Sequence, residues 1–305
     1  DNPKPSLYKL PLGADILPQF IEELKNQEDA ALVLGNGLLK ERVQFEGITH
    51  FGLDTLASKI LNANGYTNFE LINRRTQELV IEEWVDNLKE VGKKELIELL
   101  KKNHQENLSD ELMTNEKLTY FEKLADKKGF IKSITNFVNE LSATSLDFTG
   151  ISSHFKEFET NEGRTPEQII KDKEVLTLYA AYRSYLKQKD WYDIQGQFRL
   201  ALHVLQNKGD ELELPWKKLR IFGFYALEPL RIELLKELSK HVDISLAMFY
   251  ETNMEDNYIY SAASKTYECL LGFCQPEKKF ETELKQTVGL TLAKHIFKKL
   301  SLEQR

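Results

Sequence analysis

The first stretch that could carry chemistry is a strand, loop and helix near the amino terminus. Its loop, Pro11 to Asp15, stands where a phosphate-binding loop would be expected. Such a loop needs flexible glycines, a lysine that neutralises phosphate and a hydroxyl that binds magnesium. Here Gly13 is the one glycine, Ala14 follows it, and Asp15 brings a charge that would repel phosphate. Since no Gly-Lys-Ser or Gly-Lys-Thr triplet occurs in the chain, we predict that this loop does not bind phosphate.

The other polar side chains do not form a recognisable catalytic or metal-binding pattern. The six histidines lack the i, i+4 spacing of a metal pair on a helix, and the two cysteines are too few for a metal knuckle. Glu82, Glu83 and Asp86 fall on a predicted helix, where they form a solvated face. No Gly-x-Ser-x-Gly pattern surrounds a serine, and we interpret the serine-rich segment 142–153 as a helix end and loop. We therefore predict no metal site and no catalytic residue.

The composition is that of a globular protein of the cytosol. Of the 305 residues, 41% are apolar and 29% are charged, which allows one large core or two smaller ones. No run approaches about 20 uninterrupted apolar residues, so we expect no membrane association. The amino terminus lacks a basic-then-apolar signal, and we expect no secretion. The net charge of −7 counts against a protein that grips nucleic acid by bulk electrostatics.

Strand-like segments occur near both ends of the chain. The short apolar runs that predict strands are 7–10, 31–34, 48–51, 219–224 and 242–249. Helical patterns follow the third run and separate the last two, and this alternation predicts one parallel sheet with helices on its faces. The residues between the early and late runs have helical spacing throughout. We therefore expect residues 1–68 and 215–305 to form the halves of an α/β core and residues 69–214 to form a helical insertion.

In order and spacing, several segments resemble the amino-terminal part of AddB-type helicase-nuclease subunits. This family is related to RecB and to proteins with PD-(D/E)XK nuclease domains. Leu219–Pro229 resembles its I-x-V-D-G-F-x-x-F-T-P strand, Asp126–Leu141 its S-x-G-F helix, and Leu178–Asp193 its L-Y-x-x-Y helix with a trailing aspartate. Ile48–Leu61 is similar to the segment that carries the family's second helicase motif. The resemblance implies a RecA-like (P-loop NTPase-like) parallel sheet with a large helical insertion, from a bacterial protein of DNA repair and recombination.

The resemblance also shows where this chain departs from an active motor. In a helicase of this kind the late strand ends in an Asp-Glu pair that binds magnesium and activates water. This chain has Phe222, Gly223 and Phe224 there instead. Gly223, like the loop residues 13–15, is thus predicted to be a degenerate nucleotide-site position, and we expect no cofactor. The family's nuclease motifs are not in this sequence, so we expect a fragment whose full-length protein is a DNA exonuclease through a further carboxy-terminal domain.

Four residues are candidates for contact with DNA through the same resemblance. Thr55 and Lys59 hold the position at which related motors touch the backbone of a single strand, and Arg74 and Arg75 are further candidates. We expect weak binding to single strands or ends and an AddA-like helicase subunit as partner. The function predicted is a catalytically inactive helicase-like domain that serves as scaffold and DNA guide. Two alternatives stay open, a docking domain without DNA contact and a nucleotide hydrolase with an unrecognised loop.

Overall fold

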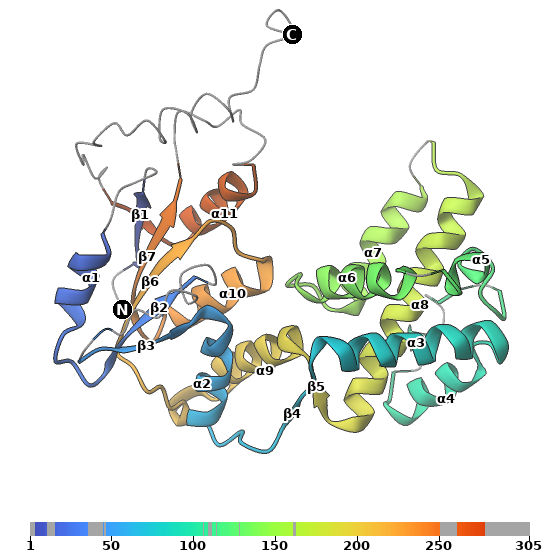
Figure 1. Cartoon of the computed structure of the whole chain (residues 1–305), viewed down its shortest axis with the longest axis horizontal. Coiled ribbons are helices and arrows are strands. Elements are labelled where there is room, and N and C mark those ends of the chain that lie inside the picture. The colour runs from blue at the N-terminus through green and yellow to red at the C-terminus, as the bar shows by residue number, and fades with distance from the viewer. Residues whose placement is uncertain are drawn as a thin grey trace, which may run out of the picture. The chain divides into compact units, whose positions relative to one another are not determined.

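The structure is a computed structural model of the chain. It describes residues 4–10, 16–35, 45, 47–105, 107–108, 112–113, 115–127, 129–160, 163–250 and 261–277. The chain divides into two compact units, one made of Asp1–Thr67 with Phe198–Arg305 and one made of Asn68–Gln197. We call them the sheet unit and the helical unit (Figure 1). The second boundary between them falls inside helix α9 (Ile194–Asn207).

The sheet unit contains one six-stranded sheet in the order β3-β2-β6-β7-β1-β8, and every pairing in it is parallel. Its strands are β1 (Ser6–Leu10), β2 (Ala30–Leu34), β3 (Thr49–Gly52), β6 (Lys218–Phe224), β7 (Asp243–Phe249) and β8 (Gln275–Pro276). Strands β2 and β6 lie side by side, with Val33 opposite Ile221, although the helical unit separates them in sequence. The predicted RecA-like parallel sheet with a helical insertion is thereby confirmed.

Helices cover both faces of this sheet. Phe20 and Leu24 of α1 (Leu17–Leu24) pack in one apolar cluster with Leu32 of β2, Phe222 of β6 and Ala247 of β7. Figure 1 shows α10 (Pro229–Leu238) and α11 (Ser261–Leu271) on the other side of the sheet. All five residues of β2 are buried, as expected for a strand between two layers of helices. The remaining elements of the sheet unit are η1 (Leu53–Thr55), α2 (Leu56–Ala63) and η3 (Gly209–Glu211).

The helical unit is built around its longest helix, α8. Its elements are β4 (Glu70–Leu71), α3 (Arg74–Glu90), α4 (Lys94–Lys102), α5 (Glu122–Ala125), α6 (Phe130–Ser142), α7 (Phe148–Glu159), α8 (Pro166–Lys189) and β5 (Trp191–Tyr192). A capping box between Thr165 and Gln168 starts α8, and Asp190 ends it in the left-handed conformation, with φ of 56°. The predicted solvated face of α3 is confirmed, because Glu82, Glu83 and Asp86 are exposed. None of the helices in the described part of the chain is long and apolar enough to cross a membrane.

Candidate functional site

The carboxyl ends of parallel strands form the edge at which open α/β sheets place their ligands. At this edge of the sheet unit the backbones of β2 and β6 approach closely. The amide of Gly35, directly after β2, donates a 2.9 Å hydrogen bond to the carbonyl of Phe222. A Cβ on residue 35 would lie 2.1 Å from the carbonyl oxygen of Gly223, so a larger residue does not fit. Gly223 itself has φ of +84° and lies at an irregularity of β6, which explains why glycine occurs there.

Aromatic rings occupy the end of β6, where the family resemblance implies carboxylates in an active motor. Phe222 is 4% exposed, and its ring packs edge-on against Phe249 of β7 at 5.7 Å between centroids. Tyr225 continues the cluster at 5.1 Å from Phe249, and its side chain is half exposed. A phenylalanine ring offers no oxygen to Mg²⁺, which binds through carboxylates, phosphates and water. The end of β6 therefore supplies an apolar surface in place of metal ligands.

Two carboxylates do lie beside this edge, and one buried guanidinium holds both. Asp54 follows β3 and is 2.6 Å from Arg231, while Glu228, directly before α10, is 3.2 Å from the same side chain. Arg231 is 8% exposed and its guanidinium lies 5.0 Å from the ring of Phe198. This arrangement ties the segment after β3 to the start of α10. Within the residues that the structure describes, no group of three or more His, Cys, Asp or Glu is placed to hold a metal ion.

A lysine at the end of β1 is directed at aromatic rings. The ammonium of Lys9 lies 3.9 Å from the ring centre of Tyr267 on α11 and 4.6 Å from that of Tyr250 after β7. The two rings stack at 5.1 Å. The lysine thus makes cation–π contacts with both rings. Burial, followed by the neighbouring Tyr250, raises the pKa of Tyr267. The degenerate nucleotide-site positions predicted after this strand, Gly13, Ala14 and Asp15, lie outside the described residues.

Thr55 and Lys59 lie one turn apart at the start of α2. Thr55 is exposed and precedes the helix without a side-chain capping bond. Lys59 is partly buried, its ammonium 4.9 Å from the ring centre of Phe51, and it lines a pocket of about 410 Å³ with Trp216. This pocket also includes Thr49, the first residue of β3, so it lies at the amino end of the strand. The proposed DNA contacts of these two residues stay a prediction.

Arg74 and Arg75 start α3 in the helical unit and share one carboxylate. Both guanidiniums pair with Glu78, at 3.2 Å and 3.5 Å respectively. Arg74 also donates to the Asn136 side chain at 2.5 Å, and this links α3 to α6. Arg75 is the freer of the two, because 71% of its side chain is exposed. The four candidate DNA contacts are therefore divided between the two units.

The predicted L-Y-x-x-Y helix with its trailing aspartate forms a buried polar cluster. The hydroxyl of Tyr182 donates to Asp193 at 2.8 Å, and the amide of Gly196 donates to the same carboxylate at 2.5 Å. Arg183 approaches it at 3.5 Å. Burial, and then the charge of Asp193, raises the pKa of Tyr182 far above its ordinary value. Since Tyr182 and Asp193 are both 0% exposed, this motif holds α8 to the start of α9 and presents no surface for a ligand.

Sequence reasoning missed two features of these units. The first is the pair of carboxylates around Arg231, which depends on the meeting of strand ends that are distant in sequence. The second is a group of phenylalanines on the helical unit; Phe130 and Phe137 are seven residues apart on α6, and Phe155 and Phe158 are three apart on α7. Such spacing places both rings of each pair on one side of a helix, and this was the available signal.

Comparison with known proteins supplies the family. The family model described as "ADDB, N-terminal" matches residues 108–303, which is well over half of the 305-residue chain. The matched region includes most of the helical unit and the late strands β6 and β7. No curated protein matches the chain.

Proposed function

Since the chain belongs to the AddB N-terminal family, we propose that its sheet unit is a catalytically inactive helicase-like domain of an AddB-like helicase-nuclease. In this proposal the domain acts as a scaffold and DNA guide during DNA end processing and repair. The observation that carries it is the buried ring of Phe222 at the carboxyl end of β6, packed against Phe249. A RecA-like sheet without carboxylates at this point keeps the fold of a motor and lacks the ligands for Mg-ATP.

Calorimetric titration with Mg-ATP tests the inactive state. We expect no heat beyond that of dilution, because several charge-assisted contacts worth about 1.5–3 kcal/mol each are missing. Titration with magnesium alone serves as the control for metal binding by the carboxylates around Arg231. A dissociation constant in the low micromolar range would contradict the proposal and favour a nucleotide hydrolase with an unrecognised loop.

The role as DNA guide is tested by fluorescence anisotropy with labelled oligonucleotides. We expect weak binding that favours single strands or ends and is lost between about 50 and about 200 mM salt, because a chain of net charge −7 displaces few counterions. Lys59→Ala should lower the salt slope by about one, and Thr55→Ala should weaken binding at both salt concentrations. Lys265→Ala on α11 is the matched control, since this lysine is exposed and was not a candidate contact. Tight duplex binding that ignores both α2 substitutions would place the DNA surface elsewhere.

A second function, docking of an active helicase partner without DNA contact, is favoured by the acidic net charge. In this case the partner is an AddA-like helicase subunit. The ring cluster that includes Tyr225 at the carboxyl end of β6 then has a structural role and does not contact DNA. Absence of any DNA binding at the lower salt concentration would select this function over the guide. A retained complex with the helicase subunit in size-exclusion chromatography would then be the positive result.

A further inference from the structure

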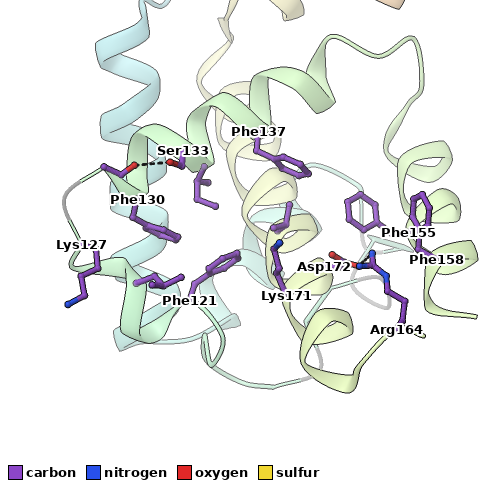
Figure 2. A pocket seen from close by; sticks show the side chains of 14 residues that line it. Phe121, Lys127, Phe130, Ser133, Phe137, Phe155, Phe158, Arg164, Lys171 and Asp172 are labelled. Carbon is purple, nitrogen blue, oxygen red and sulfur yellow. Dashed lines mark hydrogen bonds and ion pairs between the residues drawn. The ribbon is translucent and has the colours of Figure 1, made fainter. Parts of the chain in front are cut away.

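A pocket of about 820 Å³ opens on the helical unit, and the phenylalanines of α6 and α7 described above line it. Figure 2 shows phenylalanine side chains from α6, α7 and the segment before α5 gathered around it. Phe137 and Phe158 are 37% and 50% exposed, unlike the buried Phe121 and Phe130. Large aromatic side chains that stay this exposed around a concave surface mark interaction sites more often than isolated exposed residues do.

The walls of the pocket are fixed by the fold. Phe121 is held through its amide, which donates a 2.9 Å hydrogen bond to Glu174, a carboxylate of α8 that is 0% exposed. On the opposite side Arg164 lies 5.6 Å from the ring centre of Phe158 and pairs with Asp172 of α8 at 2.5 Å. These contacts hold Phe121 and Phe158 at two sides of the pocket, which lowers the cost of ordering these two residues when a ligand binds.

The charge around the pocket is positive. Lys127 and Lys171 are exposed, and no ion pair is found for either within the described part of the chain. Asp172 is the single carboxylate among the lining residues that the structure describes, and it is offset by Arg164 and by the nearby Lys171. Figure 2 shows the rings between Lys127 at one end and Arg164 at the other. An apolar floor with a cationic rim complements a ligand that is both apolar and acidic.

We propose that this pocket binds an acidic peptide segment of a partner protein, which inserts one or two large apolar side chains between the phenylalanine rings. A peptide fits better than single-stranded nucleic acid, which uses a positively charged groove along several nucleotides. Here Lys127 and Lys171 are the two cations of the described lining without an ion pair, too few to follow a backbone of several phosphates. This lining also contains no Asn or Gln to form hydrogen bonds with base edges. The proposal concerns the helical unit and does not depend on the inactive state of the sheet unit.

The test is fluorescence anisotropy with a synthetic peptide of about 12 residues, long enough for about three helical turns, in which two phenylalanines stand four apart among glutamates. Three comparison probes are the same peptide with serine for phenylalanine, the same peptide with lysine for glutamate, and oligothymidine. The pocket variants are Phe137→Ala and Lys171→Glu. Leu79→Ala and Lys94→Glu are matched controls, because both residues are exposed and lie outside the pocket lining.

We expect the acidic phenylalanine peptide to bind with a dissociation constant of tens of micromolar, and each pocket variant to weaken it by about tenfold or more. The control variants should leave it unchanged, and the serine and lysine probes should bind at least about tenfold more weakly. Equal binding of the lysine probe, indifference to both pocket variants, or no saturable binding of the acidic peptide would overturn the proposal. Oligothymidine binding that the same pocket variants weaken would overturn it in favour of a nucleic-acid site. Circular dichroism of every variant separates loss of binding from loss of fold.

Discussion

In the described part of the sheet unit two buried arginines each bridge two carboxylates, whereas the buried charges of the helical unit are carboxylates. The sheet unit also has one buried carboxylate, Glu237, which pairs with Lys240 at 2.7 Å. In the sheet unit Arg220 is 7% exposed and bridges Glu23 of α1 at 2.8 Å and Asp243 of β7 at 3.1 Å. Arg231 bridges two carboxylates in the same manner. Arg220 thereby joins α1 to β7, and Arg231 joins the segment after β3 to the start of α10. The planar group with five donors suits this task, because it can bond in two directions at once.

In the helical unit the buried charges are carboxylates. Glu174 is 0% exposed and accepts hydrogen bonds of 2.6 to 2.9 Å from the amides of Thr119, Tyr120 and Phe121. The carboxylate of Asp193, also fully buried, accepts from an amide near the start of α9 and from a tyrosine hydroxyl. Helix starts and loops leave amides without partners, and a unit made of helices therefore needs acceptors.

The difference predicts how each unit responds to the loss of its buried charge. The four carboxylates around Arg220 and Arg231 keep 35% to 44% of their side chains exposed, so they can return to water. The amides that donate to Glu174 belong to the backbone and cannot turn towards water in the same way. Removing an acceptor in the helical unit should therefore cost more than removing a guanidinium in the sheet unit.

The largest expected effect is that of Glu174→Ala. Three amides lose their acceptor inside the helical unit, and each unsatisfied buried donor costs about 1–3 kcal/mol. We expect the free energy of unfolding to fall by about 4 kcal/mol, measured by urea denaturation followed by circular dichroism. Glu98→Ala on the exposed side of α4 is the control and should change it by less than about 0.5 kcal/mol. An equal loss in the free energy of unfolding in Glu174→Ala and Glu98→Ala would contradict this prediction and show that water can bond to these amides.

This same carboxylate shows what the sequence could and could not predict. Periodicity predicted the five long strands, the helical insertion and the helix around Glu174, because these follow from local spacing of apolar residues. The partners of Glu174 are 53 to 55 residues away, and nothing in its own surroundings indicates them. The segment 142–153 was predicted as a helix end and loop, and this is confirmed for residues 142–147, where α6 ends. It is wrong for residues 148–153, which form the first part of α7, because the serines at 152 and 153 favoured a loop. In the structure Asp147 caps this helix by accepting from the amide of Gly150 at 2.8 Å.

The candidate site stays a prediction at the end of β6. The sequence shows Phe222 where the family pattern has a carboxylate, and the structure adds that its ring is buried and packs against Phe249. The close approach of Gly35 to Gly223 could not be predicted, because it requires the register of β2 against β6. The same is true of Asp54 and Arg231, which are 177 residues apart in sequence. Pairing between distant strands decides these contacts, and one sequence carries no direct signal of it.

A smaller effect is expected from Arg231→Met in the sheet unit. Methionine keeps the apolar contact with Phe198, and the two released carboxylates can turn to solvent. We expect a loss of about 1–2 kcal/mol in the free energy of unfolding, measured by urea denaturation. Arg75→Met is the control, because this arginine is largely exposed and should contribute little. A loss as large as that of Glu174→Ala would remove the distinction between the two units.

The smallest effect concerns the pH dependence of stability. Burial raises the pKa of Asp172 in the helical unit, with Arg164 opposing the shift. In the sheet unit a hydrogen bond from Lys217, whose ammonium is 3.0 Å away, lowers the pKa of Asp29. A raised pKa means that the folded state holds its proton as pH rises past the ordinary value of 3.8, while the unfolded state releases it. Ionisation of Asp172 therefore destabilises the fold above that pH, and ionisation of Asp29 stabilises it.

Asp172→Asn and Asp29→Asn should accordingly shift the pH dependence in opposite directions. Relative to the wild type, Asp172→Asn should gain stability as pH rises from about 3 to about 7, by less than about 1 kcal/mol because solvent and Arg164 offset part of the cost of burial. Asp29→Asn should lose relative stability over the same range, because the wild type gains the ion pair between its side chain and the Lys217 ammonium as Asp29 ionises. Thermal unfolding at several pH values measures both. If the two differences from the wild type have the same sign, then burial does not dominate at Asp172, and its pairing with Arg164 makes the ionised form the stable one.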